Sequence, residues 1–475
     1  MKKTVNGSTD SPRDKVYFIG IGGIGMSALA RYFLSEGWKV SGSDLSPSSI
    51  TTELKKEGAV IYTGKQSANN VRRSAPTLVV YNNAIRTDNP EFTEAKKMGL
   101  AIRSYPEVVG ELTKKYKTIA LAGSHGKSTT TAMTALILME AGYDPTVIIG
   151  TKLKEFSPVV IASEAKRSYK SANVRSPRHS VPRDDRYAVN FRKGKGGWLV
   201  LEADEWKAAF LNYHPYVATI TNIDAEHLDF YKNFANVKKT FEEFRKRCGK
   251  VVERPKDGKL VTEIKKVLQI PGDHNVSNAL NAYAVADYIG IPKKTILKAL
   301  GKYQGAWRRM EYRGIMKHKT RNTEHNKSKN MLYVPSSKIH VFDDYAHHPS
   351  EIKATLAAFK QKWPKNPLIC VFQAHQADRL RRLFSGFKTA FKVADRVVIL
   401  PEYKVAGREE VFDKNHNAKA LAKAIGAEYL ENPKDLKMAL RRHVSSLYSK
   451  SYILNPIIVM MGAGDIINFT DELVK

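Results

Sequence analysis

Short apolar runs alternate with amphipathic helical patterns along most of this 475-residue chain. Val16–Ile19 is followed by a glycine-rich turn, a helical pattern over Met26–Gly37 and a second apolar run at Lys39–Ser43. Parallel strands need long crossover connections, usually helices, so this alternation predicts parallel sheets with covered faces. A disordered chain and a membrane bundle are excluded, because hydrophobic residues make up 42% and charged residues 26% of the sequence.

The pattern restarts twice, which predicts three α/β domains at roughly 150 residues per domain. New strand-then-helix blocks open at Thr118–Ala122 and at Ile339–Phe342. We place the domains at residues 1–113, 114–305 and 306–475. A long helix is expected at Val276–Ile289 and a further one near Pro349–Trp363. Other buried strands are expected at Thr77–Tyr81, Trp198–Leu201, Val217–Thr221, Leu368–Phe372, Arg396–Leu400 and Ile457–Met461.

The chain is strongly basic, with 78 Lys and Arg against 47 Asp and Glu and a net charge of +31. Such a charge first suggests a nucleic-acid-binding protein. The excess of positive charge is concentrated in three stretches of the chain, however. Residues 151–200 hold 12 basic and 4 acidic side chains, residues 231–270 hold 12 and 5, and residues 313–330 hold 6 and 1.

Two of these basic regions contain polar segments without periodicity, Ser157–Val189 and Met316–Ser337, which we interpret as insertions or loops. They lack the interleaved aromatic residues on which bases stack, and this argues against a nucleic-acid interface. We therefore expect no nucleic-acid partner.

The two cysteines, Cys248 and Cys370, cannot form a disulfide framework, which is typical of a reducing cytoplasm. The N-terminal run Val16–Leu34 contains several glycines and Arg31, so it predicts a strand, turn and helix rather than an export signal. No other run of 18 uncharged apolar residues occurs, and no membrane span is expected. These features predict a cytoplasmic protein.

A G-x-G-x-x-G motif, Gly20-Ile21-Gly22-Gly23-Ile24-Gly25, lies between the first predicted strand and helix. Glycines let the backbone approach a diphosphate, and the helix N-terminus supplies N–H donors. Asp44 ends the next strand, where its carboxylate can meet a ribose. This context predicts nucleotide binding, although the motif fits a UDP-sugar as well as NAD. The alternative is a glycine-rich structural turn.

The sequence Gly123-Ser124-His125-Gly126-Lys127-Ser128-Thr129 follows a strand and opens a helix. It is the second half of a P-loop, with Leu121 where the full motif has a first glycine. Backbone N–H groups can still surround a phosphate, with Lys127 on the β/γ oxygens and the Ser128 hydroxyl on Mg²⁺. The sequence therefore predicts an ATP site.

Polar clusters follow several other predicted strands, at the sheet edge where open α/β sheets bind ligands. Glu202 begins the acidic run Glu202–Glu205, which could ligate Mg²⁺ or form a solvated turn. His227 lies in Asn222–Asp229 and by itself is more typical of a structural histidine. Asp343–Pro349 indicates a polar site or a helix cap, and His375 and Arg379 suit an anion.

In their order, these motifs resemble those of the Mur ligases, the ATP-dependent amide-forming enzymes of peptidoglycan synthesis. The resemblance spans residues 15–470 and is carried by Phe18–Ser27, Gly123–Thr130, Glu202–Glu205, Asn222–Asp229, Gly272–Leu280, Arg308–Arg309, Asp343–Pro349 and Gly462–Ile466. It implies a Rossmann-like UDP-sugar domain, a central P-loop ATPase domain and a Rossmann-like C-terminal domain that binds the amino acid and closes over the ATP.

The resemblance also implies a reaction. ATP phosphorylates the carboxylate of UDP-N-acetylmuramate to an acyl phosphate, and the amine of L-alanine displaces the phosphate. The P-loop and metal neutralise charge on the γ-phosphoryl group. ATP and Mg²⁺ are the expected cofactors, and UDP-N-acetylmuramate and L-alanine the expected partners.

Site residues are implied motif by motif. Lys127 holds the γ-phosphate, Ser128 and Glu202 bind one Mg²⁺, and Glu202 and His227 bind a second. The ATP site consists of Gly123–Thr129, with His274, Asn275 and Asn278 at the adenine and Arg309 and Asp344 at the nucleotide from the third domain. His347, His348, His375 and Arg379 line the amino-acid and phosphate region, and of these His347 and Arg379 join Lys127, Glu202 and His227 as catalytic. The UDP end is held by Gly20, Gly22, Gly23, Ile24, Gly25 and Asp44.

Three departures from the family pattern stand out. Gln376 in Ala374–Arg379 replaces an arginine, the insertion Ser157–Val189 separates segments that look like neighbours, and Phe241–Ile270 lacks strands that the family usually has. Three alternatives remain open: a ligase that reattaches a recycled peptide to UDP-N-acetylmuramate, a degraded homologue that binds without much catalysis, and a basic P-loop protein that binds nucleic acid. A monomer and a homodimer are both compatible with the sequence.

Overall fold

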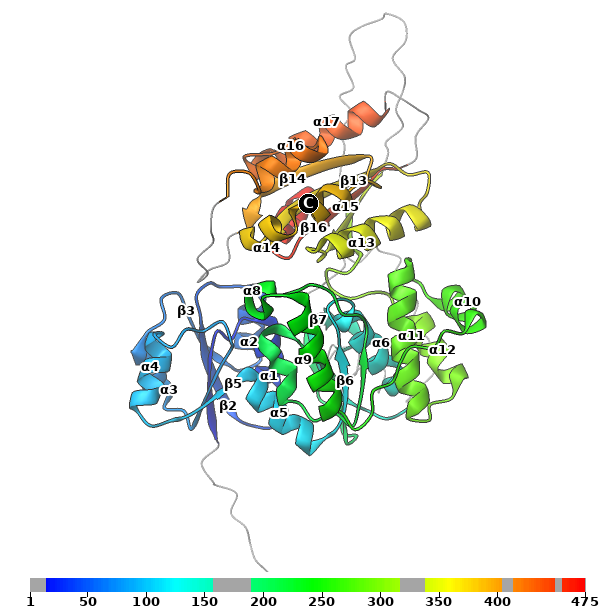
Figure 1. The fold of residues 1–475 in the computed structure, drawn as a ribbon. Helices are drawn as coiled ribbons and strands as arrows, with labels where there is room; N and C mark the ends of the chain where they lie inside the picture. Colours follow the sequence, from blue (N-terminus) through cyan, green and yellow to red (C-terminus); the bar gives the residue numbers. More distant parts are fainter. Residues whose placement is uncertain (1–13, 157–188, 317–337, 404–412, 449–454, 475) are drawn as a thin grey trace, which may run out of the picture. The chain divides into compact units, whose positions relative to one another are not determined.

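A computed structural model describes residues 14–156, 189–316, 338–403, 413–448 and 455–474. The described residues form two compact units, which we treat separately. The first unit comprises residues 14–156, 189–267 and 278–301, and the second comprises residues 268–277, 302–316, 338–403, 413–448 and 455–474. Three mainly parallel sheets with helices between their strands are present, two in the first unit and one in the second (Figure 1). The predicted α/β class is confirmed.

The first sheet is entirely parallel and has the order β3-β2-β1-β4-β5. Chain order reverses on either side of β1, which creates the crevice in which such sheets bind ligands. Its strands are β1 (Lys15–Ile19), β2 (Lys39–Asp44), β3 (Val60–Thr63), β4 (Leu78–Tyr81) and β5 (Ala101–Ser104), and its helices are α1 (Ile24–Ser35), α2 (Ser49–Lys56), α3 (Ala68–Ser74), α4 (Pro90–Lys97) and α5 (Tyr105–Lys115).

Alternate residues of β1 explain how this sheet is covered. Val16 and Phe18 pack into a core with α1, whereas Tyr17 and Ile19 pack into a second cluster with residues of α3 and α4. All four side chains are fully buried. Because the strand period is two, burial on both faces produces the continuous apolar run that is visible in the sequence.

The second sheet has the order β10-β6-β9-β7-β8, in which only β8 is antiparallel to its neighbour. Its strands are β6 (Lys117–Ala122), β7 (Thr146–Leu153), β8 (Val189–Arg192), β9 (Trp198–Glu202) and β10 (Val217–Ile220). Its helical segments are α6 (Lys127–Glu140), η1 (Lys154–Phe156), η3 (Trp206–Asn212), α8 (Leu228–Tyr231), α9 (Phe234–Arg247), α10 (Gly258–Val267), α11 (Asp273–Tyr288) and α12 (Lys293–Lys302). Helix α11 begins in the second unit and continues into the first.

The insertion in this domain joins two paired strands. Leu153 of β7 lies opposite Val189 of β8, so the flanks of the insertion are neighbours, as predicted. Val189, which the sequence interpretation assigned to the insertion, is instead the first residue of β8. Residues 157–188 lie outside the described part of the chain. Residues 241–270 contain α10 and a single bridge between Val251 and Ala218 but no strand, in line with the shortened region that the sequence indicated.

The third sheet, in the second unit, has the order β11-β12-β16-β13-β14-β15, with β11 antiparallel to β12. Its strands are β11 (Glu311–Met316), β12 (Ile339–Asp344), β13 (Leu368–His375), β14 (Arg396–Tyr403), β15 (Glu428–Tyr429) and β16 (Ile457–Met461). Its helices are α13 (Pro349–Lys362), α14 (Ala377–Arg382), α15 (Phe384–Ala390), α16 (Ala418–Ile425), η4 (Pro433–Asp435), α17 (Leu436–Tyr448) and α18 (Ile466–Val474).

The basic segment between β11 and β12 also joins paired strands, since Met316 lies opposite Ile339. Residues 317–337 lie outside the described part of the chain. Within the described residues, no helix is long and apolar enough to cross a membrane. The expected domain boundaries, 1–113, 114–305 and 306–475, stay a prediction.

Candidate active site

The P-loop occupies the connection between β6 and α6, and it needs glycine at two positions. Gly123 has φ +128° and Gly126 has φ +83°, values that other residues rarely adopt. A Cβ at Gly123 would lie 2.1 Å from Thr221 Oγ1, and a Cβ at Gly126 would lie 2.2 Å from Asn278 Oδ1. The loop is therefore packed tightly against the end of β10 and against α11, and Asn278, a predicted adenine contact, lies beside it.

The segment after β10 fixes the loop by hydrogen bonds. Ser124 N donates to Asn222 O (3.0 Å), and His125 N donates to Asn222 Oδ1 (3.0 Å). In the other direction Asp224 N donates to Ser124 Oγ (2.9 Å), and His125 Nε2 lies 3.2 Å from Asp224 Oδ2. The side chains of Ser124 and His125 thus hold the loop in place.

Lys127 is the first residue of α6, and its ammonium group is largely buried beside carboxylates. Nζ donates to Gly123 O (2.7 Å) and to Glu205 Oε2 (2.7 Å). Burial alone lowers the pKa of Lys127, but the carboxylates of Glu205, Asp204 and Glu202 outweigh this effect and raise it above the ordinary value. The lysine is therefore a fixed positive charge at the N-terminus of a helix, where a phosphate group is stabilised.

Ser128 and Glu202, two predicted metal ligands, are in direct contact. Ser128 Oγ donates to Glu202 Oε1 at 3.0 Å, and the other carboxylate oxygen accepts from Gly150 N at 2.7 Å. Ser128 and the following Thr129 lie buried in the first turn of α6, whereas Glu202 is the last residue of β9. Hydroxyl and carboxylate oxygens are ligands that Mg²⁺ prefers, so this pair fits the predicted metal.

His227 joins a neighbouring acidic cluster. Its Nε2 lies 3.8 Å from Glu205 Oε1, and one ligand atom from each of Asp204, Glu205 and His227 falls within 4.8 Å of the others. The His227 backbone is left-handed, with φ 55° and ψ 37°, a strained conformation that is concentrated at functional sites. The sequence pattern offered the whole run Glu202–Glu205 as possible ligands, and the family resemblance singled out Glu202; the structure places Asp204 and Glu205 beside His227.

The glycine-rich turn after β1 is held by Asp44. Gly20 N donates to Ser43 O and Gly22 N donates to Asp44 Oδ2, both at 2.9 Å. A Cβ at Gly22 would lie 2.7 Å from the same Oδ2, and Gly20 has φ +81°. Gly23 precedes α1 as its N-cap, and Ile24 and Gly25 begin the helix. Asp44 therefore shapes the turn itself, and its contact with a ribose stays a prediction.

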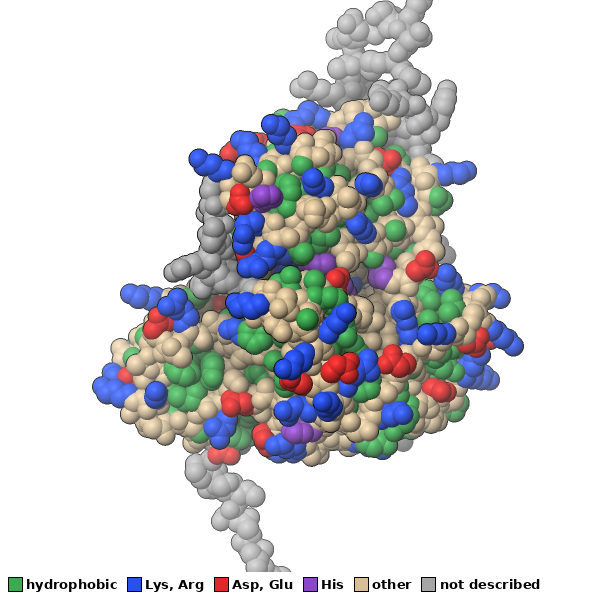
Figure 2. Space-filling model, viewed as in Figure 1, with side chains coloured by type: hydrophobic (Ala, Val, Ile, Leu, Met, Phe, Trp, Pro, Cys, Tyr) green, Lys and Arg blue, Asp and Glu red, His purple; other side chains and the backbone are tan. Residues whose placement is uncertain are grey.

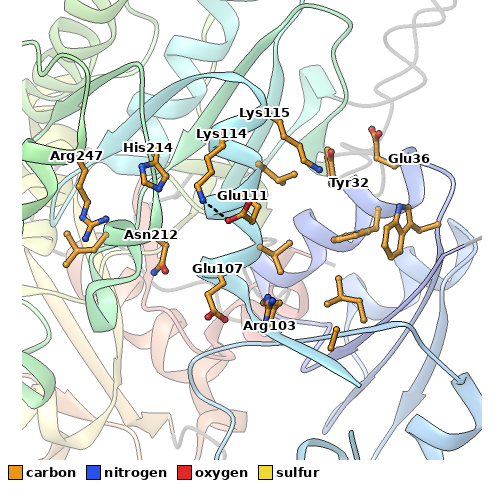
Figure 3. Close-up of a pocket in the computed structure, with 17 residues that line it drawn as sticks. Tyr32, Glu36, Arg103, Glu107, Glu111, Lys114, Lys115, Asn212, His214 and Arg247 are labelled. Carbon is orange, nitrogen blue, oxygen red and sulfur yellow. Dashed lines mark hydrogen bonds and ion pairs between the residues drawn. The ribbon is translucent and has the colours of Figure 1, made fainter. Parts of the chain in front are cut away.

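A hollow of about 1000 Å³ lies elsewhere on the first unit (Figure 3). Leu78 and Ala101 begin β4 and β5 and line this hollow, which therefore opens at the amino ends of these strands. Its rim includes the ion pair of Glu111 and Lys114 on α5, at 2.8 Å. None of the predicted site residues lines it.

In the second unit, Asp344 is the buried last residue of β12, and its carboxylate accepts several hydrogen bonds. Its carboxylate accepts hydrogen bonds from Met310 N (2.8 Å) and Ala346 N (2.9 Å). Burial raises the pKa of Asp344, although Arg309 opposes the shift. Because Met310 directly follows Arg309, the carboxylate fixes the backbone beside that predicted ATP contact. Arg309 itself lies with its guanidinium 5.3 Å from the ring of Tyr345.

The predicted adenine contacts His274 and Asn275 lie in the same unit, at the start of α11. Asn275 Nδ2 donates to Pro271 O at 2.6 Å. Burial lowers the pKa of His274 to about 4, and the positive charge of Arg309 adds to the effect. His274 is therefore neutral at physiological pH, and Arg309 lies near enough to affect it electrostatically.

The four residues of the predicted amino-acid region have three different settings. His348 is the N-cap of α13, where its ring accepts from Ser350 N (3.3 Å), so the helix-cap interpretation applies to it. His347 Nδ1 lies 2.9 Å from Tyr345 O, and the His347 and His375 rings are 6.1 Å apart. Arg379 is on α14, which begins after Gln376 with φ 72°. The structure brings His347 and His375 together and leaves the roles of all four as predictions.

Comparison with protein families matches three consecutive parts of the chain. Residues 15–117 match the family described as Mur ligase family, catalytic domain. Residues 121–266 match the Mur ligase middle domain, and residues 331–464 match the Mur ligase, glutamate ligase domain. These matches confirm the three-domain architecture.

Curated relatives match over nearly the whole chain. A UDP-N-acetylmuramate–L-alanine ligase of Aquifex aeolicus is 33% identical, with 97% of each chain covered. One from Clostridium perfringens is 34% identical and covers 97% of this chain and 98% of its own. Among solved structures, the UDP-N-acetylmuramate–alanine ligase of Thermotoga maritima has a TM-score of 0.71 at 26% identity, covering 97% and 98% of the two chains. With this identity over this length, and with three consecutive family domains, the chain belongs to the Mur ligase family.

Proposed function

We propose that this chain joins L-alanine to the carboxylate of UDP-N-acetylmuramate, with cleavage of ATP to ADP and phosphate. The observation that carries the chemistry is the constellation of Lys127, Ser128 and Glu202 around one helix N-terminus. The choice of substrates rests on full-length relatives that are named as L-alanine ligases. ATP use is a property of the Mur ligase family.

In the first step, a carboxylate oxygen of the muramoyl group attacks the γ-phosphorus of ATP, and ADP leaves. The N-terminus of α6 and Lys127 stabilise the negative charge on the phosphoryl oxygens. In this structure Lys127 donates to two carbonyl oxygens of its own loop. When ATP binds, phosphate oxygens would replace these acceptors. Its ion pair with Glu205 keeps the ammonium group aimed and charged.

Mg²⁺ fits the donor set of this site. Ser128 Oγ and Glu202 Oε1 would hold one ion, and Glu202 and His227 would hold a second. Asp204 and Glu205, which cluster with His227, could supply further donors to it. When bound, Mg²⁺ neutralises charge on the phosphates of ATP. Gly150 N, by donating to Glu202 Oε2, orients the carboxylate that would be the ligand.

In the second step, the amine of L-alanine attacks the acyl carbon, and phosphate leaves from the tetrahedral intermediate. We assign the surroundings of this step to His347, His375 and Arg379 of the second unit. The neighbouring rings of His347 and His375 support a shared polar region there. The UDP-sugar would bind at the Gly20–Gly25 turn, which follows β1 where the strand order of the first sheet reverses.

Two other interpretations have less support. A peptide-adding ligase shares this fold, as shown by the murein peptide ligase of Psychrobacter arcticus, which has a TM-score of 0.61 at 23% identity. At that identity the likeness concerns the fold alone. For a nucleic-acid binder, the face shown in Figure 2 has Lys and Arg mixed with Asp and Glu on the first unit rather than gathered in one stripe. A cytoplasmic location and a monomer or homodimer remain part of the proposal.

The test is an omission assay with purified protein. Phosphate release is measured with ATP, Mg²⁺, UDP-N-acetylmuramate and single amino acids, and then with each component left out. The proposal expects release only when all are present, with L-alanine preferred, and none from Lys127→Ala. Lys298→Ala, which changes a lysine that is 63% exposed on α12, is the matched control and should retain activity. Equal release from Lys127→Ala would refute the P-loop assignment.

A further inference from the structure

The hairpin of β7 and β8 contacts the helix that follows the glycine-rich turn. Asn190 on β8 is fully buried, and its Nδ2 donates to Ile24 O (2.5 Å) and to Ser27 Oγ (2.9 Å) in the first turn of α1. Its Oδ1 accepts from Arg31 Nη1, also on α1. Both the nitrogen and the oxygen of the Asn190 amide are therefore hydrogen-bonded to α1. Helix α1 and strand β8 are joined by these hydrogen bonds.

Buried ion pairs close this assembly into a ring. Arg31 pairs with Glu53 of α2 at 3.1 Å, and Glu53 pairs with Lys152 of β7 at 2.7 Å. The side chains of Arg31 and Lys152 are only 5% and 4% exposed. Charges this deeply buried persist only when they are paired, so moving the hairpin relative to α1 and α2 would break several charge-assisted contacts together.

The same hairpin reaches the predicted metal ligand at another point. Gly150 of β7 donates its N–H to Glu202 Oε2 at 2.7 Å, and a Cβ at Gly150 would lie 2.8 Å from that oxygen. Gly150 and Lys152 are two residues apart, which is about 7 Å along a strand. Strand β7 therefore makes both the contact to Glu202 and the contact to the helices that follow the glycine-rich turn.

We propose that the β7–β8 hairpin sets the distance between the glycine-rich turn and the Glu202 carboxylate, with Asn190 and Gly150 as positioning residues. This inference rests on the proposed function, because it requires a UDP-sugar at the turn and ATP phosphates at the P-loop. Attack on the γ-phosphorus requires reacting atoms about 3–3.5 Å apart, and a misplacement of about 1 Å can reduce the rate on the order of 100-fold. A rigid spacer between the two sites supplies this accuracy.

The first test compares two substitutions on the same strand. Asn190→Ala removes the contacts to α1, whereas the control Arg192→Gln removes an ion pair with Asp144, which is not on α1. The inference expects Asn190→Ala to lower kcat by about tenfold or more, while the KM for ATP changes less than about twofold. Arg192→Gln should leave kcat and the KM for ATP unchanged, even if both variants lower the thermal midpoint to a similar degree.

The second test uses the other end of the hairpin. Gly150→Ala should lower kcat and raise the Mg²⁺ concentration needed for half-maximal activity, without changing the affinity for UDP-N-acetylmuramate measured by calorimetry. Because one element positions both sites, the kcat/KM losses of Gly150→Ala and Asn190→Ala should combine less than multiplicatively in the double variant.

Identical kcat values for Asn190→Ala and Arg192→Gln would reduce the hairpin to a structural role and overturn the inference. If Asn190→Ala proves insoluble, Ser27→Ala removes one acceptor of the same amide and must also lower kcat. Wild-type protein that binds no UDP-N-acetylmuramate would contradict the proposed function, and this inference would fail with it. If the wild type binds UDP-N-acetylmuramate and turns it over, and Asn190→Ala behaves like the wild type, the inference is contradicted but the proposed function is not.

Discussion

Ser128 Oγ donates a 3.0 Å hydrogen bond to Glu202 Oε1, which joins the first turn of α6 to the carboxyl end of β9. Glu202→Gln keeps an acceptor oxygen for Ser128 but removes the negative charge. We expect kcat to fall by at least about 100-fold, because even residues that only support metal ligands contribute 10–100-fold. The measurement is phosphate release as a function of Mg²⁺ concentration. The control is Glu242→Gln on α9, where the side chain is 64% exposed. Equal activity of the two variants would argue against Glu202 as a ligand.

Gly123 is expected to be irreplaceable because of its backbone as well as its surroundings. Gly123→Ala would combine φ +128° with a Cβ 2.1 Å from Thr221 Oγ1, so the free energy of unfolding should fall by about 3 kcal/mol. Gly142→Ala is the matched control, since Gly142 also has positive φ, +79°, but a Cβ there would meet no atom within 4 Å. That control should lose only about 1 kcal/mol. Chemical denaturation of both variants measures the difference, and similar losses would contradict the tight packing of the loop.

His274 should make the protein less stable in acid. The folded-state pKa is lowered to about 4, while an unfolded histidine titrates near 6.5. Between these values only the unfolded state binds the proton, so stability falls as the pH is lowered through this window and the contribution is complete above it. We expect wild type to lose about 2 kcal/mol relative to His274→Gln between pH 7 and pH 4, after allowing for partial exposure. Denaturant unfolding at both pH values tests this, and an unchanged difference between the two proteins would contradict it.

Removal of residues 157–188 should preserve the fold. Leu153 and Val189 are paired in the β7–β8 hairpin, so a short Gly-Ser turn after Phe156 can reconnect the strands without a change of register. We expect a soluble protein whose thermal midpoint stays within about 2 °C, since changes away from packed features have small effects. A deletion that also removes Val189 is the comparison, and it should be less stable because it shortens β8. Insolubility of the first variant would show that the segment takes part in the fold.

The sequence predicted most of the strands that are buried on both faces, but it missed β7, whose Val147, Ile148 and Ile149 are buried. β1, β6, β9, β12, β13 and β16 are rich in buried apolar residues, and each was placed to within a few residues. Two other strands that were missed carry weaker signals. β3 begins at Val60, which is 57% exposed, and β8 contains Asn190 and Arg192, whose burial depends on partners far along the chain. Local periodicity cannot reveal a strand whose polar residues are satisfied by distant contacts.

In the candidate site, too, the sequence revealed some residues and not others. Lys127, Ser128 and Glu202 were found because their motifs are contiguous and follow apolar strands. The contribution of Gly150 could not be read from the sequence, because it is made by a backbone N–H that every residue but proline has. Asp44 makes a structural contact that the sequence also did not reveal. Its carboxylate accepts from Gly22 N, so the pattern that suggests ribose binding also stabilises the turn.

Transfer of an isotope label tests the central claim most directly. UDP-N-acetylmuramate with both carboxylate oxygens labelled with ¹⁸O is incubated with ATP, Mg²⁺ and L-alanine, and the released phosphate and the product are analysed by mass spectrometry. If the muramoyl carboxylate attacks the γ-phosphorus and L-alanine then displaces the phosphate, each phosphate released carries one ¹⁸O and the amide retains the other. Phosphate without label, or label transfer only when a peptide replaces L-alanine, would contradict the account.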